Sequence, residues 1–92
     1  MRHAGSAALD SVEELLAAVR SHAELREKKR GTFYCRGSGF LHFHEDPAGM
    51  FADLKIDGAF ERFAVNTMVE RRRFLARVAE AIRREPPRAR GR

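Results

Sequence analysis

The stretch FLHFHEDPAGMFADLKIDGAFERFAV, residues 40–65, decides the fold. Its apolar and polar residues alternate, which is typical of β-strands with one buried face. The segment Asp46-Pro47-Ala48-Gly49 has the residue order of a type I turn, and Asp57-Gly58 is a strong hairpin signal. We therefore expect antiparallel strands joined by two tight turns, over residues 40–45, 50–56 and 59–65.

Two helical segments are predicted before this stretch. Apolar residues at i, i+3, i+4 and i+7 predict a helix over residues 11–20, which begins at a capping box of Ser11 and Glu14. Beyond this range the apolar stripe changes direction, and a second capping-box spacing starts at Ser21. We therefore expect the helix to break there and a shorter helix to cover residues 22–29.

A further strand and a final helix complete the predicted fold. Residues 32–35 are rich in β-formers and precede a turn at Gly37-Ser38. Thr67 and Glu70 form a capping box that opens a helix, and Pro86-Pro87 stops it. These elements predict an α+β two-layer sandwich, a four-stranded antiparallel meander with the helices on one face. The inner face of the last helix is expected to carry Met68, Leu75, Val78, Ala79 and Ile82.

Length and charge bound the domain organisation. A chain of 92 residues allows one domain, which we place over residues 1–85, followed by a basic, disordered tail over 86–92. The net charge is +5, but residues 83–92 carry five Arg and one Glu, so residues 1–82 hold 13 basic and 12 acidic side chains. The folded body is nearly neutral. The candidates for nucleic-acid contacts are therefore the tail residues Arg88, Arg90 and Arg92.

The sequence also carries an expectation about location. No apolar run approaches the roughly 20 residues of a membrane span, and residues 1–6 lack the apolar region of a secretory signal. The single Cys35 has no partner for an internal disulfide, which agrees with a reducing compartment. We therefore expect a cytoplasmic protein without membrane contact.

Pairing the predicted hairpins assigns polar residues to one sheet face. Across the first turn His42 faces Asp53 and His44 faces Phe51, and across the second turn Asp53 faces Arg62. These pairs predict a polar row on the face opposite the helices, with aromatic rings around it. The predicted binding face consists of Phe33, Phe40, His42, His44, Phe51, Asp53, Lys55, Phe60 and Arg62, with Cys35 beside it.

Several interpretations of this face stay open besides a solvated surface with cross-strand ion pairs. Its aromatic content favours a non-enzymatic module that forms a homodimer or holds another protein or a small ligand. His42, His44 and Asp53 are candidate zinc ligands, although a zinc site needs three or four convergent ligands. Cys35 with His42 as its base would be a nucleophile without a recognisable oxyanion element. We therefore expect an interaction module rather than an enzyme, and no cofactor unless zinc binds.

Two domain families resemble parts of the chain. His42-Phe43-His44 followed by Phe51-Ala52-Asp53-Leu54 resembles the luciferase domain, a small uncharacterised family with a His-x-His strand, a short turn, an aliphatic-Asp-aliphatic strand and a helix. This resemblance covers residues 33–75, but the turn over 45–50 is longer and the Gly before the first His is missing. The element order and the strand of residues 51–56 are also similar to MmcQ/YjbR-like domains, for which DNA binding has been suggested. Both resemblances imply a fold and no established activity.

Overall fold

The computed structural model describes residues 1–87, which form three helices and a six-stranded antiparallel sheet. The predicted α+β class is confirmed, whereas the predicted number of four strands is wrong. In chain order the elements are β1 (Arg2–His3), α1 (Ser6–Asp10), α2 (Glu13–Arg20), β2 (Leu25–Lys29), β3 (Thr32–Cys35), β4 (Ser38–Asp46), β5 (Gly49–Ile56), β6 (Ala59–Ala64) and α3 (Met68–Arg84).

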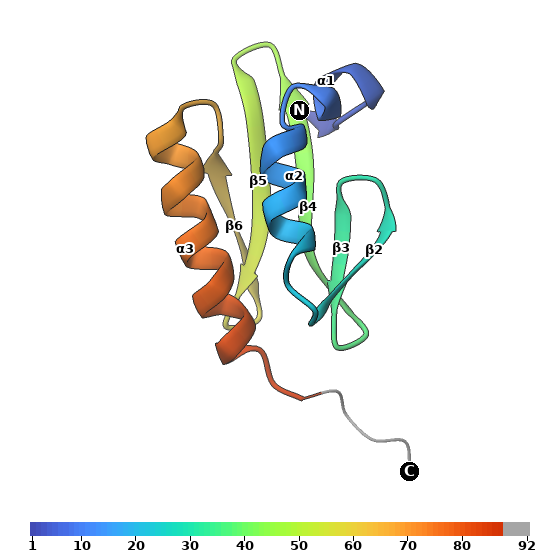
Figure 1. Cartoon of the computed structure of the whole chain (residues 1–92), viewed down its shortest axis with the longest axis vertical. Coiled ribbons are helices and arrows are strands. Elements are labelled where there is room, and N and C mark those ends of the chain that lie inside the picture. The colour runs from blue at the N-terminus through green and yellow to red at the C-terminus, as the bar shows by residue number, and fades with distance from the viewer. Residues whose placement is uncertain (88–92) are drawn as a thin grey trace.

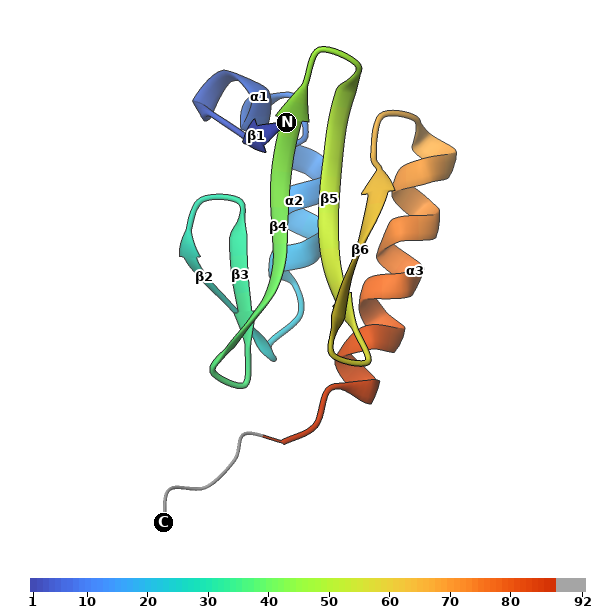
Figure 2. The same ribbon diagram turned by 180° about the vertical axis from the view of Figure 1, so that it is seen from behind.

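The helices and the sheet form two layers. The strand order is β2-β3-β4-β5-β6, and β1 pairs with the last residues of β4, beyond the segment that pairs with β3. Helices α2 and α3 lie side by side on one face of the sheet (Figure 1), and the view from behind shows the strands in front of them (Figure 2). No helix within residues 1–87 covers the second face, which is called the open face below.

The predicted register of β4, β5 and β6 is confirmed. His42 pairs with Asp53 and Asp53 pairs with Arg62, while His44 pairs with Phe51. Both turns have the predicted position, and the N–H of Ala48 donates to Oδ1 of Asp46 at 2.9 Å in the first of them. Because paired residues share a sheet face, this register assigns the polar row to the open face.

The predicted helix over residues 22–29 is wrong, because its second half is strand β2. Leu25 and Glu27 alternate with Arg26 and Lys28, and β2 pairs with β3 across a two-residue loop that ends at Gly31. Gly31 has a φ of 82°, and a Cβ there would lie 2.7 Å from a methyl carbon of Leu9. Pairing with a neighbouring strand therefore overrides the local helical signals.

The predicted end of the first helix at Arg20 is confirmed, but its start differs from the prediction, because the helical segment begins earlier and is divided near Ser11 into α1 and α2. Ser11 ends α1, where its Oγ donates to the carbonyl of Ala8 at 2.6 Å, and α2 starts without a side-chain cap. Ser21 ends α2 in the same way, with its Oγ donating to the carbonyl of Ala18 at 2.6 Å. Both serines therefore serve the ends of helices and not the predicted starts.

The hairpin between β3 and β4 shifts the register predicted for it. Its loop residues are Arg36 and Gly37, with φ of 52° and 83°, rather than Gly37 and Ser38. Phe33 pairs with Leu41 and Tyr34 pairs with Gly39, so β4 carries one additional residue at Phe40. The bulge and the shifted turn move Phe33 and Phe40 to the buried side.

The core lies between the sheet and the helices, and α3 closes it. The Thr67–Glu70 capping box is present, and the helix ends at Arg84 before the prolines, as predicted. Its buried residues are Phe74, Val78, Ala81 and Ile82, whereas Met68 is 73% exposed. Within residues 1–87, no helix has the length and apolar character needed to cross a membrane. The buried side chains of the strands and of the N-terminal helices include Leu9, Leu16, Val19, Phe33, Leu41, Phe43, Ala52 and Leu54.

Candidate metal centre

His42 and His44 lie two residues apart on β4, so both imidazoles stand on the open face. Nδ1 of His42 lies 2.8 Å from Nε2 of His44, and the ring centroids are 4.9 Å apart in an edge-to-face arrangement. His44 is buried and His42 is half-buried. The strand therefore brings two nitrogen ligands into direct contact at a site that solvent reaches from one side.

A third imidazole completes the cluster, and the sequence analysis missed it. β1 pairs with β4 so that His3 lies opposite His44, with ring centroids 4.9 Å apart. One ligand nitrogen from each of His3, His42 and His44 lies within 4.8 Å of the other two. A two-residue strand has no readable periodicity, so only the tertiary pairing of the N-terminus reveals this ligand.

Asp53 adjoins the cluster from β5. Its Oδ2 lies 3.1 Å from Nε2 of His44, and Arg62 on β6 donates to both of its carboxylate oxygens at 2.8 and 2.9 Å. Asp53 is buried, with 8% of its surface exposed, so this bidentate pair fixes the direction of the carboxylate. The predicted ligand set contained Asp53, whereas the three-nitrogen cluster contains His3 in its place.

The contacts of His44 compete for one proton. Its Nε2 contacts both Nδ1 of His42 and Oδ2 of Asp53, but a neutral imidazole carries only one N–H. A single proton between two acceptors leaves at least one contact poorly directed. A bound cation would instead attract every lone pair at this point, because imidazole nitrogen and carboxylate oxygen are both metal ligands.

The electrostatic surroundings keep His42 neutral and Asp53 charged. Burial lowers the pKa of His42, and the neighbouring imidazole of His44 lowers it further. For Asp53, burial alone would raise the pKa, but the Arg62 guanidinium outweighs this effect and lowers it. A neutral imidazole beside an ionised carboxylate is the protonation state in which these groups ligate a metal.

Aromatic and basic residues of the predicted binding face surround the cluster. The ring of Phe60 lies 5.0 Å from that of His42 and is 47% exposed, while Phe51 is half-buried opposite His44. Lys55 bonds to Ser38 and lies 3.4 Å from the carboxylate of Glu85, so its charge is already paired. Of this face, the histidines, Asp53, Phe60 and Arg62 thus form one connected group.

Three residues assigned to the open face by the sequence are instead buried in the core. Phe33 is 1% exposed, and Phe40 and Cys35 are 0% exposed, in the same apolar cluster as Leu41 and Phe43. The reason is the bulge at Phe40 and the shifted turn, which reverse the sides predicted for this hairpin. Phe33 and Phe40 are therefore not binding-face residues.

The proposed pairing of Cys35 with His42 is also wrong. Cys35 shares the buried side with Phe33, whereas His42 stands on the open face. Burial raises the pKa of the Cys35 thiol, which keeps it protonated and unreactive. This cysteine packs as a small apolar side chain.

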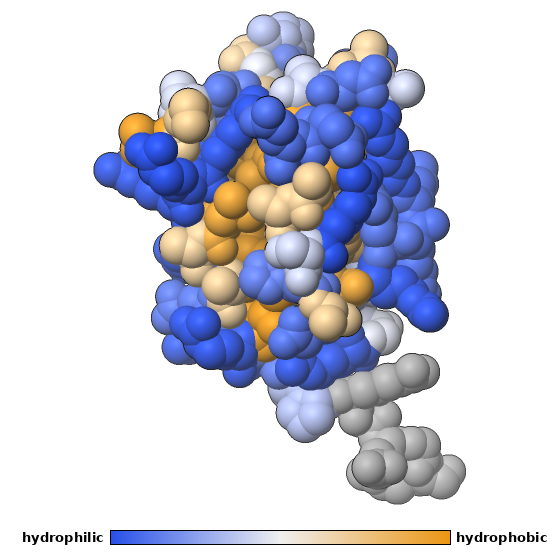
Figure 3. All heavy atoms as spheres, in the orientation of Figure 1, coloured by the Kyte–Doolittle hydropathy of each residue, from blue (hydrophilic) through white to orange (hydrophobic). Residues whose placement is uncertain are grey.

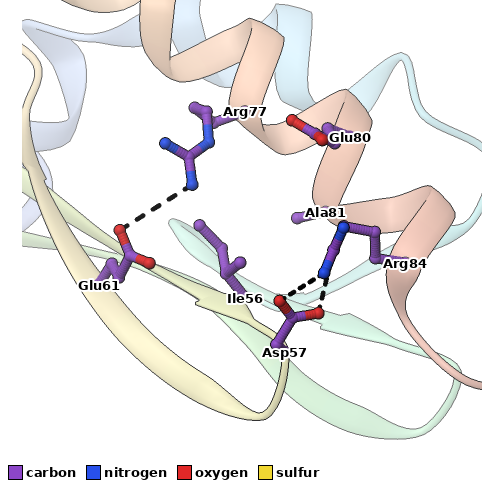
Figure 4. A pocket seen from close by; sticks show the side chains of 7 residues that line it. All are labelled: Ile56, Asp57, Glu61, Arg77, Glu80, Ala81 and Arg84. Carbon is purple, nitrogen blue, oxygen red and sulfur yellow. Dashed lines mark hydrogen bonds and ion pairs between the residues drawn. The ribbon is translucent and has the colours of Figure 1, made fainter.

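Two hollows elsewhere on the described residues contain no cluster of three metal-ligand side chains. A hollow of about 240 Å³ between the β5–β6 turn and α3 is spanned by ion pairs of Arg84 with Asp57 and of Arg77 with Glu61 (Figure 4). On the helical side, apolar side chains gather between α2 and α3 and are framed by hydrophilic ones (Figure 3). The groove there is lined by Glu14, Leu15, Met68, Arg71, Arg72 and Leu75, which include no metal-ligand group of three.

Comparisons with known proteins assign no family to this chain. No protein-family model, curated protein or solved structure matches the chain. The resemblances to the luciferase domain and to MmcQ/YjbR-like domains therefore stay predictions, as do the homodimer and the cytoplasmic location. The predicted nucleic-acid residues Arg88, Arg90 and Arg92 lie outside the described residues.

Proposed function

We propose that this chain binds a divalent transition-metal ion, zinc in the first instance, through imidazole nitrogens of His3, His42 and His44. The observation that carries the proposal is the mutual approach of one nitrogen from each ring to within 4.8 Å. Nitrogen ligands in a tetrahedral zinc site lie about 3.3 Å apart, given Zn–N bonds of about 2.0–2.1 Å. To reach this geometry, the exposed His3 side chain has to approach the other two, and the nitrogens of His42 and His44, now 2.8 Å apart, have to separate slightly.

Asp53 supports the site in either orientation of His44. If Nδ1 of His44 ligates the ion, its Nε2–H donates to the Asp53 carboxylate, which orients the ring and raises its basicity. If Nε2 ligates the ion, the carboxylate oxygen 3.1 Å away becomes a neighbouring ligand. In both cases Arg62 holds the carboxylate in place, so Asp53 stays directed toward His44.

The choice of zinc follows from the donor set. Three neutral imidazoles suit zinc, copper, nickel and iron, and they exclude magnesium and calcium, which prefer oxygen ligands. Zinc is the member of this group that needs neither a redox partner nor a particular geometry. A site with three protein ligands leaves one position of a tetrahedral ion for water or for a ligand atom of a partner.

Titration of metal-free protein with zinc tests the proposal. We expect one ion per chain by isothermal titration calorimetry, with His42→Ala and His44→Ala each weakening the affinity by at least about 100-fold, more than the loss of an outer-shell group. Cobalt in place of zinc provides a second measurement, because its visible absorption reports nitrogen coordination. Asp53→Asn is expected to weaken the affinity by about 10- to 100-fold.

His22→Ala is the matched control, because His22 is the remaining histidine and lies outside the cluster. Its affinity for zinc is expected to equal that of the unmodified chain. The proposal is wrong if the unmodified chain binds no zinc. It is equally wrong if His22→Ala weakens binding as much as His42→Ala does, since surface imidazoles would then account for the signal.

A further inference from the structure

Residues 1–82 carry nearly equal numbers of basic and acidic side chains, but the fold distributes them unevenly between the two faces of the sheet. On the strands, Glu27 bonds to Arg20 of α2, Glu61 pairs with Arg77 of α3, and Glu45 contacts the N-terminal segment. On the open face the strands place Asp53, which is neutralised by Arg62, and Asp46 at the end of β4. On the open face Asp53 balances Arg62 and Glu85 balances Lys55, so among the described residues the unpaired basic side chains of the strands there include Arg26 and Lys28.

The basic character is strongest at the β2–β3 end of this face. Arg26 pairs with Tyr34 across the two strands, and the ammonium of Lys28 lies 4.2 Å from the centre of the Tyr34 ring. A hollow of about 260 Å³ opens here, lined by Glu24, Arg26, Lys28, Tyr34, Arg36 and Gly37. Within residues 1–87, neither Arg26 nor Lys28 has a carboxylate at ion-pair distance, so both charges are available to a ligand.

Two aromatic rings lie on the same face, Tyr34 beside these charges and Phe60 at the opposite edge of the sheet. Tyr34 on β3 and Phe60 on β6 are separated by three strand steps, or about 14 Å at the usual strand spacing. Phe60 is 47% exposed, and its ring lies 5.0 Å from that of His42, so one side of the ring is accessible to a ligand. Rings set between basic side chains on an open sheet are the arrangement on which unpaired bases stack.

We propose that the open face binds single-stranded nucleic acid, with phosphates at Arg26 and Lys28 and bases stacked on Tyr34 and Phe60. A duplex is disfavoured because its bases are already stacked and a broad sheet does not enter its grooves. A second copy of the chain is disfavoured because each of the two faces would bring the positive charges of Arg26 and Lys28, which are unpaired within residues 1–87, into the interface. This surface is distinct from the basic tail and does not require the metal.

Fluorescence anisotropy with a labelled 12-nucleotide oligothymidine tests the proposal on the full chain at low salt. Binding is expected to weaken as salt rises, with a slope of log K against log salt of about −0.7 for each phosphate contact. The double variant Arg26→Ala/Lys28→Ala is expected to reduce that slope by about 1.4, the share of two contacts. Phe60→Ala is expected to weaken binding by about 5- to 150-fold, the range for the loss of one stacked base.

Matched controls on the helical side separate this surface from a general charge effect. Arg72→Ala/Arg73→Ala removes the same charge from exposed positions of α3, and Met68→Ala removes a side chain that is more exposed than Phe60. Both are expected to leave the affinity and the salt slope nearly unchanged. Circular dichroism on every variant confirms that the comparison is made on folded protein.

The remaining outcomes contradict the proposal. Equal losses in the Arg26/Lys28 and Arg72/Arg73 variants would show that only net charge matters. Loss of binding after removal of residues 86–92, with no effect of Phe60→Ala, would assign the binding to the tail. If a double-stranded oligonucleotide of the same length bound with equal affinity, stacking of unpaired bases would be excluded. Self-association of the chain without oligonucleotide binding would instead favour a dimer. Zinc and a chelator are added in parallel samples, and binding is expected to persist in the chelator sample, so this result is independent of the metal titration.

Discussion

The side chain of Asn66 forms hydrogen bonds to the backbone of β5 as a neighbouring strand would, and the absence of a side chain at Gly49 leaves space for it. The Oδ1 of Asn66 accepts the N–H of Met50 at 2.8 Å, and its Nδ2 donates to the carbonyl of the same residue at 3.1 Å. Gly49 has a φ of 134°, and a Cβ added to it would lie 2.7 Å from Oδ1 of Asn66. The side-chain amide therefore completes the ladder only if position 49 has no side chain.

Gly49→Ala is expected to lower the free energy of unfolding by about 1–3 kcal/mol, the usual cost of a strained backbone position. Urea denaturation followed by circular dichroism measures the change. Gly39→Ala is the control, since a Cβ there meets nothing within 4 Å and its φ is outside the left-handed region. Equal losses in the two variants would show that contact with Asn66 is not the cause.

At the scale of elements, one carboxylate attaches the edge strand β2 to helix α2. Glu27 accepts hydrogen bonds from Arg20 at 2.6 and 3.2 Å and from the N–H of Gly31 at 2.9 Å. Burial alone would raise the pKa of Glu27, but the Arg20 guanidinium and the Gly31 amide outweigh it, and the pKa is lowered. The charged form of this residue therefore stabilises both the helix-to-strand contact and the β2–β3 loop.

This lowered pKa predicts a pH dependence of stability. The unfolded chain has a Glu pKa of about 4.3, so the contribution of Glu27 is fully present above that pH and is lost as the pH falls through the folded value. Glu27→Gln should therefore lose stability at pH 7 and show a smaller decrease from pH 7 to pH 3 than the unmodified chain. Urea midpoints across this range measure the effect.

Glu14→Gln serves as the control, because Glu14 is exposed and makes no ion pair with any residue from 1 to 87. It is expected to keep the pH dependence of the unmodified chain. A pH profile of Glu27→Gln that coincides with both others would contradict the assignment.

For the whole molecule, Phe74 joins the two layers. It is 0% exposed, and its ring lies 6.2 Å from that of Phe43 and 5.6 Å from that of Phe63. These contacts connect α3 to strands β4 and β6, so Phe74 holds this helix on the apolar face of the sheet. A small domain has few such contacts, and each is a large part of its stability.

Phe74→Ala is expected to cost about 3–5 kcal/mol, a large share of the roughly 5–15 kcal/mol by which domains of this kind are stable. Thermal and urea unfolding measure the loss, and Phe74→Leu, which keeps much of the volume, should lose clearly less. If Phe74→Ala unfolds at the same urea concentration as the unmodified chain, the two layers are held together elsewhere.

The sequence by itself determined the three strands of residues 40–65, their register and the row of His42, Asp53 and Arg62. These features depend on the period-two pattern and on turn residues within a few positions, so local chemistry is enough to specify them. The capping box of α3 and its end before Pro86 were readable for the same reason.

Only the tertiary structure decided the remaining features of the site. The bulge at Phe40 buries two aromatic residues of the predicted face, and the pairing of β1 with β4 supplies His3. Strand β2, with the basic side chains Arg26 and Lys28, forms because β3 offers it a partner. The two residues of β1 lie far from β4 in the chain and are too few to show a period, and in β2 the local signals favoured a helix. In both cases the free energy that selects the strand comes from the burial and hydrogen bonding of the assembled sheet.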